Sequence, residues 1–102
     1  MHSRTLLMVA ATGVLAAPVA QADEALLKKH NCIACHQMDK KVVGPAYKDV
    51  AKKYKGQKDI AVKLAEKVKK GGQGVWGPVP MPPNPQVPDA DNRKMVEYIL
   101  SR

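Results

Sequence analysis

The sequence predicts a small all-α domain of short helices. Apolar residues recur at helical spacing in several segments, and the clearest set lies at i, i+3, i+4 and i+7: Tyr47, Val50, Ala51 and Tyr54. No segment alternates apolar and polar residues as a half-buried strand does, and there is no internal repeat. A chain of 102 residues forms one domain at most, which argues against a large enzyme, a repeat array and a polytopic membrane protein.

The first expected helix runs from Asp23 to about Asn31. Acidic residues begin it and basic residues, including His30, end it, an order that complements the helix dipole. We expect the His30 side chain to be solvated. The second helix is expected from Pro45, which suits a first helical position, to Gly56.

The third expected helix begins after Asp59, a suitable N-cap, and ends at Gly71. Its apolar stripe consists of Ile60, Leu64 and Val68. Asp89 is the expected N-cap of the last helix. Met95 lies four residues before Ile99 in that helix, so we expect Met95 to be a core residue.

The first 22 residues have the pattern of a secretory signal peptide. Arg4 belongs to a short basic start, an uncharged run follows, and the segment ends in the small-x-small sequence Ala20-Gln21-Ala22. The alternative is a membrane anchor, although Gly13 and Pro18 interrupt the uncharged run. We expect cleavage after Ala22, which leaves residues 23–102 as a domain exported to the periplasm.

The expected mature domain has 80 residues, and the loss of Arg4 lowers the formal net charge from +8 to +7. It contains no Phe, one Trp and three Tyr, so its apolar core is thin. Domains of this size often need a disulfide, a metal or a cofactor to be stable. We therefore expect a small basic domain built around a group that is not polypeptide.

The two cysteines lie in Cys32-Ile33-Ala34-Cys35-His36. C-x-x-C-H is the attachment pattern of a c-type haem. Two thiols at this spacing form thioethers with the two vinyl groups of one porphyrin, and the following histidine is then held against the iron. The sequence therefore predicts haem c attached through Cys32 and Cys35, with His36 as an axial ligand.

Three other interpretations of the cysteine pair remain open. A dithiol oxidoreductase uses C-x-x-C at the start of a helix after a strand, but no strand pattern precedes Cys32. A disulfide between Cys32 and Cys35 would close a very small loop and stabilise little. A structural zinc site normally has a second, distant pair of ligands.

A second axial ligand would come from a methionine or a histidine. Met38 is only two residues from His36 and cannot easily reach the other haem face. His30 is expected at a solvated helix end and Met95 in the core, so neither is the favoured ligand. Met81 is the remaining candidate among Met38, Met81, Met95 and His30.

Met81 lies in a proline-rich segment, residues 79–85. Proline fixes its own φ and restricts the preceding residue, so this segment is stiff and extended. A stiff loop suits a weak thioether ligand, because little ordering is needed when the ligand binds. Forty-five positions separate His36 from Met81, enough chain to surround a haem. The alternative is an exposed methionine in a proline-rich turn.

The preceding segment, residues 71–78, is rich in glycine. It lacks the G-x-x-x-x-G-K-[ST] pattern of a phosphate-binding loop. Its glycines would instead let backbone approach a flat cofactor. Trp76 supplies a ring and one N–H donor here, or is an ordinary core aromatic.

Three segments together resemble the small class I monohaem cytochromes c of bacteria. They are CIACH at 32–36, VGPAYKDVA at 43–51 and GVWGPVPMPP at 74–83. The resemblance is to the short periplasmic type of pseudomonads, ammonia oxidisers and hydrogen oxidisers, and it covers essentially residues 23–102. It implies the class I cytochrome c fold, in which short helices surround one covalent haem and the N- and C-terminal helices cross.

The resemblance also implies roles for individual residues. Met81 would be the second axial ligand, and the Pro45 carbonyl would accept a hydrogen bond from Nδ1–H of the axial histidine. Trp76 and Lys67 would contact haem propionates, and Asn84 would hydrogen-bond near the Met81 sulfur. The segment 85–88 is richer in proline than in many members, and the lysine content is high.

These features predict a periplasmic one-electron carrier of a respiratory chain, not an enzyme. The lysine surface suggests redox partners with acidic docking surfaces, or serves solubility alone. Nucleic acid is not an expected partner, a stable membrane anchor is not expected after cleavage, and we expect a monomer. The alternative functions are a haem peroxidase or gas sensor with a displaceable Met81, and a structural or metal-binding module without haem.

Overall fold

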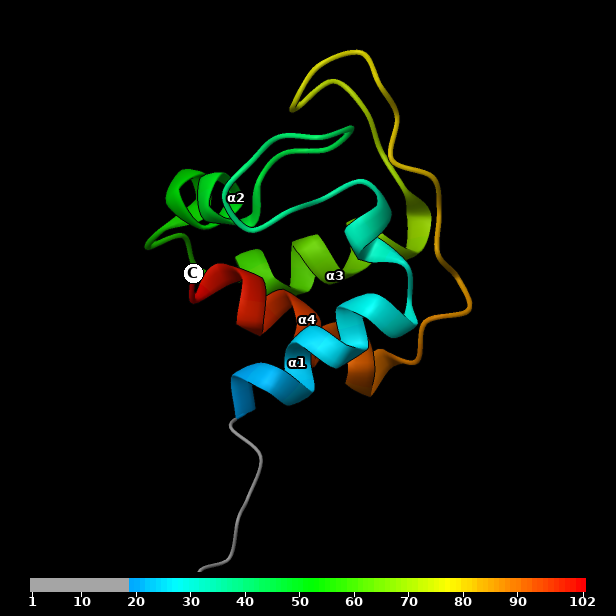
Figure 1. Ribbon diagram of the computed structural model, residues 1–102. Helices are drawn as coiled ribbons and strands as arrows, with labels where there is room; N and C mark the ends of the chain where they lie inside the picture. The colour runs from blue at the N-terminus through cyan, green and yellow to red at the C-terminus, as the bar shows by residue number, and fades with distance from the viewer. Residues whose placement is uncertain (1–18) are drawn as a thin grey trace, which may run out of the picture.

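The structure is a computed structural model that describes residues 19–102, with side chains from Asp23 onward. Within this range the chain forms four α-helices and one short 3-10 helix (Figure 1). They are α1 (Val19–Lys29), η1 (Cys32–Ala34), α2 (Tyr47–Tyr54), α3 (Ile60–Lys70) and α4 (Asp89–Leu100). Extended pairing in the described residues is limited to two isolated bridges, so the predicted all-α class is confirmed.

The first helix differs from the prediction at both ends. It begins at Val19, four residues before Asp23, and ends at Lys29, before a left-handed Asn31 with φ 61°. Residues 1–18 of the predicted leader lie outside the described residues. Its last four residues, 19–22, form the first turn of α1. No helix within 19–102 has both the length and the apolar character needed to cross a bilayer.

The predicted helix starts are wrong in detail. Pro45 lies two residues before α2, which begins at Tyr47. Asp59 precedes α3 as predicted, but it adopts φ 58° and its side chain makes no capping hydrogen bond. Asp89 is the first residue of α4, after Pro88 at the cap position. These helices are positioned by packing of their apolar sides and not by side-chain caps.

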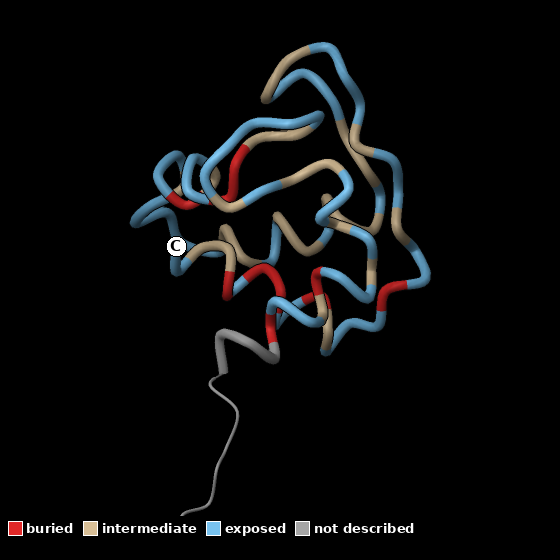
Figure 2. The backbone as a smooth tube through the Cα atoms, in the orientation of Figure 1, coloured by how far each residue is buried: buried red, intermediate tan, exposed pale blue. Residues whose placement is uncertain are grey.

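Helix α4 is the centre of the fold, since it packs against α1, α2 and α3 (Figure 1). The terminal helices α1 and α4 therefore lie against each other. Buried residues gather along these two helices and at the start of α2, whereas the long loop between α3 and α4 is mostly half-buried or exposed (Figure 2). The buried core cluster consists of Leu27, Tyr47, Val87, Met95 and Tyr98.

The prediction for Met95 is confirmed, because this side chain is buried in the core cluster. The prediction for His30 is wrong. Its side chain is 9% exposed, and its Nε2 lies 3.0 Å from Oδ2 of Asp91. The partner lies 61 positions away in the sequence, so local charge patterning gave no sign of this contact between α1 and α4.

Candidate functional site

A cavity of about 550 Å³ lies between the helices and the two long loops. Its volume falls in the range of small-molecule and cofactor sites. The wall contains seven of the eight residues that the sequence singled out, from η1, the loop before α2, α3 and the loop before α4. They are Cys32, Cys35, His36, Pro45, Lys67, Trp76 and Met81.

The two cysteines lie within one tight turn. Cys32 begins η1, and the backbone N–H groups of Cys35 and His36 both donate to the Cys32 carbonyl, at 3.2 and 3.1 Å. Both thiols are free and half-buried. Burial raises the pKa of the Cys32 thiol, so the group is held in its neutral form. The turn therefore presents two unoxidised sulfurs and the following imidazole to one cavity.

The His36 ring is held by three neighbours. Its Nδ1 lies 2.8 Å from the Pro45 carbonyl oxygen, which accepts only from a protonated Nδ1 and so leaves Nε2 with the free lone pair. The Tyr47 ring stacks on the imidazole, with centroids 5.3 Å apart and an interplanar angle of 21°. A Cβ at Gly44 would lie 2.4 Å from His36 Cε1, so only glycine fits beside the ring.

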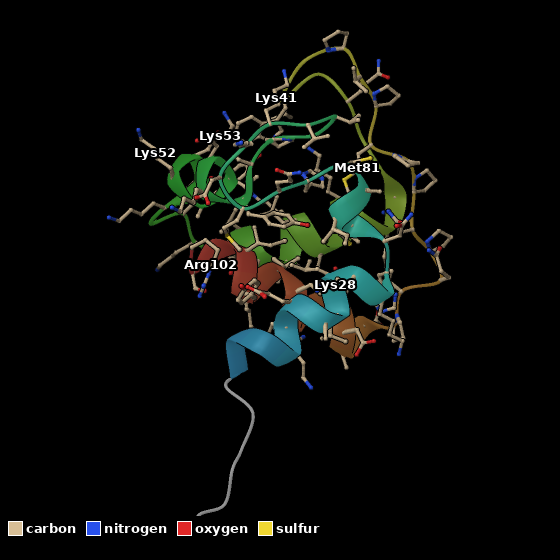
Figure 3. All side chains as sticks on the ribbon, in the orientation of Figure 1. Lys28, Lys41, Lys52, Lys53, Met81 and Arg102 are labelled. Atoms are coloured by element: carbon tan, nitrogen blue, oxygen red, sulfur yellow. The ribbon has the colours of Figure 1, made fainter. Side chains whose placement is uncertain are left out.

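The Met81 loop is fastened to the end of α3 by its backbone. Gly72 N–H donates to the Met81 carbonyl at 3.1 Å, and Met81 N–H donates back to the Gly72 carbonyl at 2.7 Å. The chain can approach this closely because Gly71, with φ 74°, has no Cβ; one would lie 2.5 Å from the Met81 carbonyl oxygen. Met81 itself, labelled in Figure 3, is half-buried. It lines the cavity together with His36.

Asn84 stands apart from the other predicted site residues, because it does not line the cavity. Its backbone N–H donates to the Val68 carbonyl at 2.9 Å. Its side-chain Nδ2 donates to the Pro82 carbonyl at 3.0 Å and lies 3.4 Å from the Val68 carbonyl. The side chain thus fastens the Met81 loop to α3, and its amide hydrogens point to backbone oxygens and not to the Met81 sulfur.

Lys67, in the last turn of α3, and Trp76, in the loop between α3 and Met81, both line the cavity. The Lys67 stem passes close to Gly72, where an added Cβ would lie 3.2 Å from Lys67 Cε. The Lys53 ammonium lies over the Trp76 ring, 5.4 Å from its centroid, and 5.9 Å from that of Tyr54. These contacts place cationic and N–H donor groups at the cavity wall.

The residues of the cavity fit a haem c. The cavity combines two adjacent thiols, an imidazole with a free Nε2, a thioether from a distant loop, and a mainly aliphatic wall. Tyr47 also lines this cavity; its hydroxyl is buried and has no hydrogen-bond partner within residues 19–102, and burial raises the pKa of its phenol. Within residues 19–102, no three His, Cys, Asp or Glu side chains gather as a metal site.

Sequence reasoning missed two residues of the site. Gly44 and Tyr47 shape the surroundings of His36, but neither is a proposed haem attachment point or iron ligand. The role of Gly44 can be recognised only from its contact with the His36 ring in the structure. Tyr47 was expected on the apolar face of its helix, and it does belong to the core, but its stacking on His36 was not visible from periodicity.

Comparison with known proteins gives consistent matches. The family model described as cytochrome c matches residues 21–102. Cytochrome c-552 of Nitrosomonas europaea is 55% identical, with 90% of this chain and 89% of the relative aligned. Cytochrome c-551 of Pseudomonas aeruginosa is 48% identical, with 100% and 99% aligned. The crystal structure of wild-type N. europaea cytochrome c552 superposes with a TM-score of 0.75 at 55% identity, covering 76% of this chain and 96% of that one.

Proposed function

Because the chain belongs to the cytochrome c family, we propose that it is a periplasmic carrier that moves single electrons between proteins of a respiratory chain, with His36 and Met81 as axial ligands. Members of the family are electron-transfer proteins, and the two cysteines, Cys32 and Cys35, carry one covalent haem c. The observation that supports the ligand assignment is the shared cavity, into which the C-x-x-C-H turn and the Met81 loop both project. When bound, haem c supplies an iron that alternates between the ferric and ferrous states.

His36 is held in one tautomer and one orientation. The Pro45 carbonyl accepts the Nδ1 proton, so Nε2 is the nitrogen available to iron. Tyr47 and Gly44 confine the ring from its flat side and its edge. A ligand confined in this way moves little when the charge at the iron changes, which favours fast electron transfer.

Met81 supplies a neutral, soft thioether. Such a ligand favours the ferrous state, and His/Met ligation raises the reduction potential. The two hydrogen bonds with Gly72 keep the backbone of Met81 in place whichever oxidation state is present. We therefore expect a positive reduction potential; a clearly negative one would contradict this ligand pair.

Trp76 and Lys67 are proposed to bind the haem propionates. Indole N–H and ammonium groups are suitable donors to carboxylates, and both residues lie at the cavity wall. Asn84 is proposed to act one step further away, by keeping the loop that carries Met81 attached to α3.

The visible spectrum of the reduced protein, recorded before and after addition of carbon monoxide, tests the ligand assignment. With both axial positions filled, sharp c-type bands should stay unchanged. Met81→Ala should make the spectrum respond to carbon monoxide at once, whereas Met38→Ala, the matched control, should not. A prompt response of the unmodified protein would favour a gas sensor or a peroxidase instead.

The remaining part of the proposal concerns maturation and assembly. We expect export to the periplasm, cleavage after Ala22, a monomer, and transient association with redox proteins that have acidic surfaces. Mass spectrometry of the exported protein should give the mass of residues 23–102 plus one haem. Retention of residues 1–22 would contradict the cleavage site.

A further inference from the structure

The net charge of the expected mature chain is confined to one segment. Residues 39–70 contain eleven lysines and four acidic residues, a formal charge of +7. The segment 23–31 has two acidic and two basic residues, 89–102 has three of each, and 71–88 has no charged residue. Since 39–70 builds α2 and α3 while the other charged segments build α1 and α4, one half of the fold carries all the excess charge.

Within residues 39–70, ion pairs neutralise more of the positive charge around α3 than around α2. Lys70 pairs with Glu66 at 2.5 Å, and Lys69 pairs with Asp89 of α4. These hydrogen bonds lower the pKa of both carboxyl groups, so the pairs persist in mildly acidic solution. Such exposed pairs add little stability, but they do cancel charge at this surface.

The α2 side keeps its positive charge. We define the α2 lysine patch as Lys41, Lys52, Lys53 and Lys55. All four are exposed, and within residues 19–102 none forms an ion pair with a carboxylate. The neighbouring Lys48 is paired with Asp39, at 2.6 Å. In Figure 3, Lys41, Lys52 and Lys53 lie toward one end of the molecule, and Lys28 lies away from them on α1.

The α2 lysine patch borders the cavity. Lys41 itself lines the cavity, next to Val42 and Val43, which are 47% and 48% exposed. Lys53 reaches the Trp76 ring at the cavity wall. A partner attracted to the patch would thus be brought beside an exposed apolar rim of the site, the combination of charged flank and apolar centre that short-lived electron-transfer complexes need.

We propose that the α2 lysine patch is the docking surface for an acidic redox protein, and that the one-sided charge orients the carrier so that α2 and the cavity rim approach first. This inference rests on the proposed electron-transfer function and specifies its partner surface. A net charge of +7 spread evenly over the surface would attract acidic partners to any face, whereas a charge confined to one half attracts them to that face. The α1 and α4 surfaces are predicted to take no part in docking.

Reduction of the ferric holoprotein by an acidic flavodoxin tests the proposal in a stopped-flow experiment. One electron leaves the flavin hydroquinone, which becomes the semiquinone, and the cytochrome becomes ferrous. Lys52→Glu/Lys55→Glu is compared with the control Lys28→Glu/Lys29→Glu. Both double variants change the net charge by the same amount, and none of the four residues lines the cavity.

At low ionic strength the α2 variant should lose about tenfold or more in second-order rate constant, and the α1 variant less than about threefold, because steering depends on local potential. The salt dependence of the rate should also flatten only in the α2 variant. Equal losses in both variants would overturn the proposal in favour of net charge alone. A third outcome would overturn the proposal in favour of a lipid surface. In that case the rates would not depend on the charge of the flavodoxin, and the protein would bind phosphatidylglycerol vesicles through the α2 lysine patch.

The extent of reduction by excess ascorbate and the midpoint potential separate this inference from the proposed function. Both should be the same in the unmodified protein and in the two double variants. If the unmodified protein cannot be reduced and reoxidised reversibly, the carrier function itself fails. If it can, and the two variants do not differ with flavodoxin, only the assignment of the docking surface fails.

Discussion

The Gly44→Ala substitution tests whether the surroundings of His36 are as tight as the structure indicates. An added Cβ would lie 2.4 Å from Cε1, 2.8 Å from Nδ1 and 2.9 Å from Nε2 of His36. All three distances are below a normal van der Waals contact, and they involve one rigid ring. The ring cannot easily turn away, because it is hydrogen-bonded to Pro45 and stacked on Tyr47.

Overpacking of this kind typically costs about 1–3 kcal/mol, and we expect Gly44→Ala to lower the free energy of unfolding of the holoprotein by that amount. Guanidinium denaturation of the holoprotein, followed by far-UV circular dichroism, measures it. The displaced ring should also shift the visible spectrum and the reduction potential, since His36 is the proposed ligand. These two readouts separate damage to the ligand from a general loss of stability.

Gly56→Ala provides the control. Gly56 has φ 76° and no atom within 4 Å of an added Cβ, so its substitution costs only backbone strain, about 1–2 kcal/mol. It should destabilise the protein and leave the spectrum and the potential unchanged. If Gly44→Ala had the stability, spectrum and potential of the unmodified protein, the argument that Gly44 confines His36 would be refuted.

Three further predictions concern contacts outside this ring. His30→Ala removes the 3.0 Å contact between α1 and Asp91 of α4 and should lower the free energy of unfolding by about 1 kcal/mol at neutral pH in urea denaturation; no change would show that the contact is not formed in solution. Tyr98→Phe removes the 2.7 Å hydrogen bond to Glu24 and should cost about 1 kcal/mol at pH 7. Burial, followed by this hydrogen bond, raises the Tyr98 pKa above 10.0, so the contribution of the phenol is complete below pH 10 and is lost as pH rises through the raised pKa; a cost that stays constant from pH 7 to pH 11 would contradict this. Asn84→Ala removes the side-chain contacts that hold the Met81 loop against α3, so the reduced protein should bind carbon monoxide faster. An unchanged spectrum and an unchanged binding rate would show that Asn84 does not hold Met81 in place.

The sequence was informative where the signal is local. The helical periodicity of 47–54 and 60–70 is set by neighbours three and four residues apart, and both helices are present. The cysteine pair with His36 is a five-residue pattern fixed by the chemistry of attachment. Met81 stood out because prolines on both sides stiffen its backbone, and the structure places it at the same cavity as His36.

The errors arose where distant segments decide the outcome. Asp59 is of a residue type that favours the N-cap, but its backbone is left-handed and its side chain makes no capping hydrogen bond. His30 has the pattern of a solvated helix end until Asp91 is brought against it by the crossing of α1 and α4. Gly44 lies in one of the three segments that carry the family resemblance, but its contact with the His36 ring, eight positions earlier, is not visible in the sequence. None of these contacts is encoded in the spacing of nearby residues.

The arrangement of buried residues explains why such a short chain needs its cofactor for more than redox chemistry. The core cluster formed by polypeptide lies between α1, α4 and the start of α2. Beside this cluster, residues such as Leu64, Val68 and Ile99 are only half-buried, and they line the cavity. A haem in that cavity covers these side chains and supplies the apolar area that a chain without Phe does not provide.

The same reasoning explains why the Met81 loop has attachments of its own. A bond from iron to a neutral thioether is weak and changes with oxidation state, so it cannot by itself hold a long, largely exposed loop in place. Two hydrogen bonds to Gly72 on one side of Met81 and the Asn84 contacts with α3 on the other hold the loop through polypeptide alone. In the proposed carrier, the Met81 sulfur would therefore stay in position whether iron is ferric or ferrous, which is the property that a carrier needs and that a gas-binding site must lack.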